Sequence, residues 1–301
     1  MHAERSAAQP AAGLSAGIGA APWLWPGLAL VVVAWWASWF GPGPLRHQAF
    51  FPLWFGYILT VDGLVRLRAG ESLLTRNPAR LALLFAFSVP LWWVFEWANG
   101  FLGNWRYALP YPYAPVVYAL LASLAFSTVM PALFETASLA RTFRPFAGPI
   151  RGPRIALGRA GLVIIALAGA ATFAASLLWP GYAFPLVWIG LFLLIDPINT
   201  LLGWRSLAGE VAHGRWDTVV VLWVTGLACG FFWEFWNVLA MPKWVYSVPF
   251  VGEPKLFEMP VLGYGGYLPF VLEVFAAYNL LYGLLFRRRD DYLTFVGDDR
   301  L

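Results

Sequence analysis

Charged residues are scarce in this sequence: Asp, Glu, Lys and Arg make up 12% of its 301 residues, whereas hydrophobic residues make up 60%. A soluble domain contains about 25% charged residues, so this composition excludes an ordinary soluble domain. The mean hydropathy is +0.65, and several apolar runs reach the ~20 residues that a membrane-spanning helix needs. The sequence therefore predicts an all-α, polytopic membrane protein.

Cysteine and histidine are also rare. A single cysteine, Cys229, lies in an apolar run and excludes a disulfide framework. His2, His47 and His213 lie far apart in the sequence, so we expect no metal site. The chain has no P-loop, no dinucleotide-binding glycine pattern and no Gly-x-Ser-x-Gly motif, and we predict no cofactor. Its basic residues flank apolar segments, which indicates membrane topology rather than binding of nucleic acid.

Eight apolar segments are expected to form membrane helices in two groups of four. They cover residues 23–40, 51–67, 80–100, 115–140, 159–179, 184–204, 217–240 and 260–286. With both termini in the cytoplasm, 16 of the 20 Lys and Arg residues fall on the cytoplasmic side and 4 on the other. This asymmetry satisfies the positive-inside rule. We therefore expect a multi-pass protein of the cell membrane, the inner membrane in a bacterium.

The two groups of segments resemble each other. WWVFEWANGFLGNWRY (92–107) matches FFWEFWNVLAMPKWVY (231–246), and each stretch contains Glu, then Asn three residues later, then Trp-x-Tyr. FPLWFGYILTVD matches FPLVWIGLFLLID, and MPALFE matches LPFVLE. Because each group has an even number of segments, both copies keep one orientation, which predicts a parallel duplication.

The predicted organisation follows from this match. We expect a disordered cytoplasmic tail at 1–22, repeat 1 at 23–140, a basic cytoplasmic linker at 141–158, repeat 2 at 159–286 and a solvated cytoplasmic tail at 287–301.

Acidic residues recur in register within the apolar segments of both copies. An acidic side chain at the centre of a membrane helix costs about 2.5–3.5 kcal/mol on insertion scales, so such residues usually have a function. We predict that Glu135 and Glu273 act as acid and base, with Glu96 and Glu234 in support. The residues predicted to contact a substrate are Asn99, Asn237, Asp62, Asp196, Trp105, Tyr107, Trp244 and Tyr246.

Simpler explanations exist for the same residues. Buried carboxyl and amide groups can bond helices together without any catalytic role. The Trp-x-Tyr residues are also typical of the aromatic belt at a membrane interface.

The repeated order of an acidic residue near the end of one span, an apolar stretch with a second acid, Trp-x-Tyr, and a proline-led acidic segment resembles the lycopene cyclase domain of carotenoid pathways. In that family the acid of a Trp-Asp-type motif corresponds to Glu96 and Glu234, and the Trp-x-Tyr motif to Trp105/Tyr107 and Trp244/Tyr246. The family's adjacent pair of glutamates is absent here, and single Glu135 and Glu273 follow the prolines by four residues.

The resemblance implies acid–base chemistry without net oxidation or reduction. We therefore expect an integral membrane enzyme that cyclises, hydrates or isomerises an isoprenoid or carotenoid-like lipid within the bilayer. The alternatives are a proton-coupled transporter that uses the same carboxyl groups as a relay, and a scaffold in which those groups only join helices.

Overall fold

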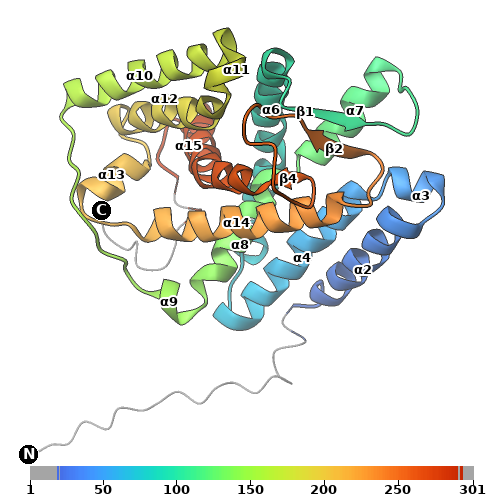
Figure 1. The fold of residues 1–301 in the computed structure, drawn as a ribbon. Helices are drawn as coiled ribbons and strands as arrows, with labels where there is room; N and C mark the ends of the chain where they lie inside the picture. Colours follow the sequence, from blue (N-terminus) through green and yellow to red (C-terminus); the bar gives the residue numbers. More distant parts are fainter. Residues whose placement is uncertain (1–18, 20, 291, 294–301) are drawn as a thin grey trace, which may run out of the picture.

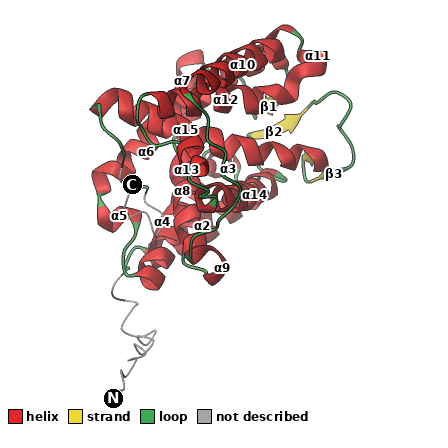
Figure 2. Ribbon diagram, turned by 90° about the vertical axis from the view of Figure 1, so that its left-hand side faces the viewer, coloured by secondary structure: helices red, strands yellow, loops and turns green. Residues whose placement is uncertain are grey.

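Helices make up most of the computed structural model, which describes residues 19, 21–290 and 292–293 (Figure 2). In the first half of the chain the elements are α2 (Leu24–Phe40), α3 (Gly43–His47), α4 (Phe50–Ala69), α5 (Leu73–Arg76), α6 (Pro78–Leu102), β1 (Trp105–Ala108), α7 (Pro115–Phe126), α8 (Val129–Arg141) and α9 (Arg144–Ala147). In the second half they are α10 (Arg159–Leu178), α11 (Pro180–Ala183), η2 (Phe184–Leu186), α12 (Val187–Leu201), α13 (Leu207–Ala212), α14 (Asp217–Asn237), β2 (Lys243–Tyr246), β3 (Lys255–Leu256), β4 (Met259–Pro260), η3 (Val261–Gly266) and α15 (Tyr267–Phe286). Residues 1–18 and 20 of the expected disordered tail lie outside the described residues.

Membrane-length apolar helices dominate the described part of the chain. Seven helical segments are long and apolar enough to cross a bilayer, and α2 is an apolar helix of 17 residues. Each expected apolar segment coincides with one of these helices. The prediction of a helical membrane protein is confirmed at this level.

Glycines allow two pairs of helices to cross closely. In the pair α2 and α4, a Cβ atom added at Gly27 or Gly56 would lie 2.9 Å from atoms of the other helix. In the pair α10 and α12, a Cβ added at Gly169 or Gly190 would lie 2.4 or 2.6 Å from the facing backbone. Small residues permit such close approach, which is the usual source of helix association in lipid.

The centre of the bundle is formed by α8, α14 and α15. Every residue of α8 from Val129 to Ala137 is buried, and so is every residue of α15 from Phe270 to Asn279. Both stretches carry a glutamate, so the two acids predicted as the catalytic pair lie on the most enclosed helices.

A break separates α7 from α8 inside one membrane-length segment. Pro131 follows the break, and its ring and missing N–H prevent a regular helix one turn earlier. Ser88 of α6 compensates, since its Oγ donates to the carbonyl of Phe126 and accepts from the amide of Met130 at 3.2 Å. Backbone groups inside a bilayer need such partners because no water is present there.

Two short strands depart from the all-helical expectation. Strands β1 and β2 pair antiparallel although about 140 residues separate them, with Trp105 opposite Tyr246 and Tyr107 opposite Trp244. They lie side by side at one edge of the helical body (Figure 1). The two Trp-x-Tyr segments thus satisfy each other's backbone groups. We call this edge the strand end, and the opposite end, formed by α5, α9 and α13, the linker end.

Candidate functional site

A cavity of about 710 Å³ opens at the strand end. Nearly half of its lining residues are aromatic, and none of the described ones is Asp, Glu, Lys or Arg. The lining comes from both halves of the chain: α4, α6, α7 and β1 from the first, and η2, α12, α14, β2 and α15 from the second. Two of its exposed residues, Tyr182 (82%) and Phe250 (79%), stack on each other with ring centroids 5.8 Å apart.

Glu234 lies directly behind the cavity wall on α14. It is fully buried, and its Oε1 accepts three hydrogen bonds: from Tyr246 and Tyr267 hydroxyls at 2.8 Å each, and from Trp244 Nε1 at 3.3 Å. All three donors line the cavity. The Glu234 carboxyl is therefore separated from the cavity by the aromatic residues that donate hydrogen bonds to it.

Glu96 has a matching environment on α6. Its Oε1 accepts from the Tyr107 hydroxyl at 2.6 Å, from Trp92 Nε1 at 3.0 Å and from Trp105 Nε1 at 3.1 Å. These donors also line the cavity. We call each set of a glutamate and its aromatic donors a Glu–Tyr–Trp unit.

The third donor differs between the two units. At the alignment offset of 138 residues, Trp92 corresponds to Gly230, and Val129 corresponds to Tyr267. A Cβ atom at Gly230 would lie 2.5 Å from the Tyr267 ring, so the glycine leaves room for that ring. The two units thus obtain the same number of hydrogen bonds from different helices.

Asn99 and Asn237 hold the strands rather than a ligand. Nδ2 of Asn99 donates to the carbonyl of Trp105 at 2.8 Å, and Nδ2 of Asn237 donates to the carbonyl of Trp244 at 2.8 Å. Their Oδ1 atoms accept from the amides of the same two tryptophans, at 3.2 and 3.0 Å. Neither asparagine lines the cavity. Both ends of each amide bond to strand backbone, and contact of these two residues with a substrate stays a prediction.

Asp62 and Asp196 act as helix caps at the linker end. Asp196 accepts from the amides of Leu207 and Ala208, each at 2.8 Å, at the start of α13. Asp62 accepts from the amide of Leu74 and the hydroxyl of Ser72, each at 2.9 Å, at the start of α5. It also accepts from Trp23 Nε1 at 2.8 Å. Their oxygens are used in this way and neither residue lines the cavity, so their contact with a substrate also stays a prediction.

Glu135 and Glu273 are fully buried in the central helices and do not line the cavity. Both oxygens of each carboxyl lack a hydrogen-bond partner among the described residues. The six predicted acids therefore do not converge on one chamber. The structure brings only Glu96 and Glu234 to the cavity wall, together with Trp105, Tyr107, Trp244 and Tyr246.

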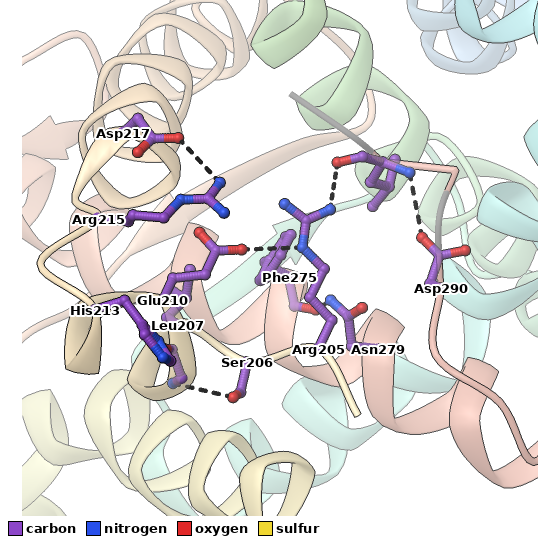
Figure 3. Close-up of polar contacts among 12 residues, drawn as sticks. Arg205, Ser206, Leu207, Glu210, His213, Arg215, Asp217, Phe275, Asn279 and Asp290 are labelled. Carbon is purple, nitrogen blue, oxygen red and sulfur yellow. Dashed lines mark hydrogen bonds and ion pairs between the residues drawn. The ribbon is translucent and has the colours of Figure 1, made fainter. Parts of the chain in front are cut away.

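A second polar cluster closes the linker end (Figure 3). Arg205 donates from Nε to Glu210 at 3.0 Å and from Nη1 to the carbonyl of Leu293 at 2.6 Å. Arg80 pairs with Asp290, which also accepts from the Tyr278 hydroxyl at 3.2 Å.

The residues just after α15 are enclosed by this cluster. Asp290, Tyr292 and Leu293 are all buried, at 5%, 3% and 1% exposure. The prediction that 287–301 forms a solvated tail is therefore wrong for these three residues: Asp290 and Leu293 bond to the buried arginines, and the Tyr292 hydroxyl donates to the carbonyl of Leu73. Residues 291 and 294–301 lie outside the described residues.

Several cavity residues were not predicted from the sequence. Trp92 carries a weak signal, since it precedes Glu96 by four residues and therefore shares its helix face. Tyr267, Trp188 and Asn104 carry none, because they approach the cavity only through tertiary packing. Comparison of the chain with family models, curated proteins and solved structures finds no match.

Proposed function

We propose that this protein is a membrane enzyme that binds a long apolar lipid of the isoprenoid type in the strand-end cavity and rearranges it by acid–base chemistry. The observation that carries the proposal is the presence of two Glu–Tyr–Trp units behind the wall of one cavity. Cavities of about 300–1,000 Å³ with apolar walls and few polar groups are typical ligand sites. The volume of about 710 Å³ accommodates a lipid segment of this kind.

In the proposed reaction, one unit adds a proton to a carbon–carbon double bond of the lipid, and the other removes a proton from the resulting carbocation. A second double bond closes on the cation between these steps, so the product is an isomer and no redox partner is required. Aromatic faces such as those of Trp188 and Phe270 stabilise the positive charge. The apolar walls exclude water, which would otherwise capture the cation.

The tyrosines are the groups that touch the ligand in this proposal. Tyr107 and Tyr246 lie on the strands, outside the membrane-length helices, and burial raises the pKa of both hydroxyls well above the usual value. They therefore remain protonated at neutral pH. In the unit that acts as the acid, the tyrosine gives its proton to the double bond and takes one from the protonated glutamate behind it; in the unit that acts as the base, the tyrosine takes a proton from the carbocation and gives its own to the glutamate carboxylate. This assigns Glu96 and Glu234, rather than Glu135 and Glu273, as the acid and base.

The proposal includes the duplicated architecture and the resemblance to the lycopene cyclase domain. Support for duplication comes from the matched surroundings of Glu96 and Glu234, of Asn99 and Asn237, and of the two capping aspartates. Support for the resemblance comes from the acidic residue and the Trp-x-Tyr motif lying together in each half.

The test is expression in a bacterium that accumulates lycopene, with growth in D₂O. We expect a changed pigment profile and one deuterium incorporated per proton addition, measured by mass spectrometry. Glu96→Gln and Glu234→Gln should each lower turnover by about 100-fold or more, since general acid–base groups contribute about 10²–10⁴.

Glu253→Gln is the matched control, because Glu253 is exposed and lies outside the cavity lining. It should leave turnover unchanged. An unchanged pigment profile, or full activity in Glu234→Gln, would contradict the proposal.

Proton-coupled transport is the second candidate, and the unpartnered carboxyl groups of Glu135 and Glu273 favour it. They lie on the central helices between the two ends of the molecule, where a proton relay would be needed. Uptake into proteoliposomes that requires a pH gradient, and that Glu273→Gln abolishes, would support transport over catalysis.

A further inference from the structure

Among the described residues that line the cavity, Asn104 is the one with an enclosed polar atom that lacks a hydrogen-bond partner. Asn104 lines the cavity and is 4% exposed. Its Oδ1 is enclosed and accepts no hydrogen bond among the described residues, whereas its amide nitrogen is not enclosed in this way. A buried amide without a partner is destabilising, so an unused one at a cavity wall indicates a missing ligand group.

The backbone around Asn104 is fixed on both sides. Its amide donates to Oδ1 of Asn99 at 2.9 Å, and its carbonyl accepts from the amide of Ser247 at 2.8 Å, which extends the β1–β2 ladder by one pair. The Cα atom of Asn104 is therefore held beside the cavity by the strand pairing. The side-chain amide of Asn104 can therefore form a hydrogen bond with a ligand at this position.

The corresponding position in the second half is different. Lys243 also stands directly before a Trp-x-Tyr motif, but it pairs with Glu258 and donates to the carbonyl of Val238 at 3.2 Å. Lys243 does not line the cavity. The residue before the Trp-x-Tyr motif thus offers a polar group to the cavity in the first half only. A ligand therefore meets a polar side chain beside one motif and none beside the other.

From these observations we infer that the ligand carries a hydroxyl group, bound by the amide of Asn104, on an otherwise apolar chain. Because Oδ1 is enclosed, the end of the amide that a ligand can reach is Nδ2, and a hydroxyl oxygen accepts a hydrogen bond from it. The inference rests on the proposed function of the cavity and narrows its substrate class from a hydrocarbon to a lipid alcohol. Asn104 is then a specificity-determining residue, because a chain without the hydroxyl leaves the amide unpaired.

The experiment measures quenching of tryptophan fluorescence in the purified full chain by geranylgeraniol and by the C20 hydrocarbon that lacks its hydroxyl. We expect the alcohol to bind at least tenfold more tightly. Asn104→Leu, which keeps the approximate size of the side chain, should reduce alcohol affinity about tenfold and leave hydrocarbon affinity unchanged. Retained hydrocarbon binding then shows that the variant is folded.

Asn279→Leu is the matched control, since Asn279 is also a buried amide with an unpartnered Oδ1 but lies outside the cavity lining. It should keep the preference for the alcohol. Equal binding of both lipids by the unmodified protein, or an unchanged preference in Asn104→Leu, would overturn the inference and leave the cavity's function standing. Binding of neither lipid would overturn both. The comparison in the unmodified protein decides the question even where a variant does not fold.

Discussion

At the scale of the residue, the two Glu–Tyr–Trp units show how one set of interactions is obtained in two ways. Tyr267 occupies the space beside Gly230, whereas Trp92 supplies the third hydrogen bond in the other unit. The residue types at these positions are therefore linked. Because the Tyr267 ring fills the space beside residue 230, a side chain larger than that of glycine at 230 would require a smaller one at 267.

This linkage predicts the effect of Gly230→Ala. The new Cβ would lie 2.5 Å from the Tyr267 ring, and overpacking of this kind costs about 1–3 kcal/mol of unfolding free energy. Combining it with Tyr267→Val should remove most of that penalty, giving a coupling energy of about 0.5–3 kcal/mol in a double-mutant cycle.

The measurement is thermal or denaturant unfolding of the purified protein in detergent. Gly100→Ala is the control, because a Cβ at Gly100 meets nothing within 4 Å. It should leave stability unchanged or raise it. Additive effects of Gly230→Ala and Tyr267→Val would show that the two positions are independent.

Asp196 supports a second prediction at this scale. Asp196→Ala should lower the unfolding free energy by about 1–3 kcal/mol for each amide left without a partner, namely those of Leu207 and Ala208. The folded fraction should still bind a cavity ligand with unchanged affinity, measured by fluorescence titration. Loss of binding at unchanged stability would instead favour a substrate contact.

The sequence predicts some of these residues and not others, for a physical reason. Glu, Asn and Trp-x-Tyr recur at nearly constant spacing, so it is predictable that each glutamate and asparagine lies beside its own Trp-x-Tyr segment. The capping role of Asp196 is not, because it depends on where the loop after α12 folds back. The location of Glu135 and Glu273 away from the cavity is not predictable either, because the spacing of residues along a helix does not show which face of the helix borders the cavity.

At the scale of the element, the segment that contains α7 and α8 illustrates how a broken helix is accommodated within the bilayer. One hydroxyl, that of Ser88, provides both a donor and an acceptor to the backbone at the break. Helix α15 begins in a similar way, after the 3₁₀ turn η3 and with Pro269 in its first turn. The two breaks place the ends of α8 and α15 beside the cavity, where Val129 and Tyr267 contribute to its lining.

Replacement of this hydroxyl tests its role. Ser88→Ala should lower the unfolding free energy by about 1–3 kcal/mol, because the amide of Met130 and the carbonyl of Phe126 lose a buried partner. Hydrogen exchange at the Met130 amide should become faster. Ser138→Ala is the control, since Ser138 bonds only to a carbonyl of its own helix, that of Phe134 at 2.8 Å, and it should change stability by less than about 0.5 kcal/mol. Equal effects of the two changes would show that the break needs no special support.

At the scale of the whole molecule, the two ends of the bundle are built differently. The strand end holds the open, aromatic cavity, and the linker end is closed by buried ion pairs. Helix α15 connects them, since its 20 residues extend about 30 Å at 1.5 Å per residue. The segment after α15 then bonds to Arg80 of the first half and to Arg205 of the second, so it joins both halves at the end away from the cavity.

This arrangement predicts different outcomes for two truncations of the C-terminus. Removing residues 290–301 takes away Asp290 and the carbonyl of Leu293, which leaves two buried arginines with fewer partners. Loss of one partner of a buried ion pair costs about 3–5 kcal/mol, so the thermal midpoint should fall sharply. Removing only residues 294–301 keeps every described contact of this segment, so the midpoint of this chain should stay well above that of the chain that ends at 289. A similar midpoint for both truncated chains would mean that the enclosed segment does not hold the halves together, and that the buried arginines find compensating partners within the bundle itself.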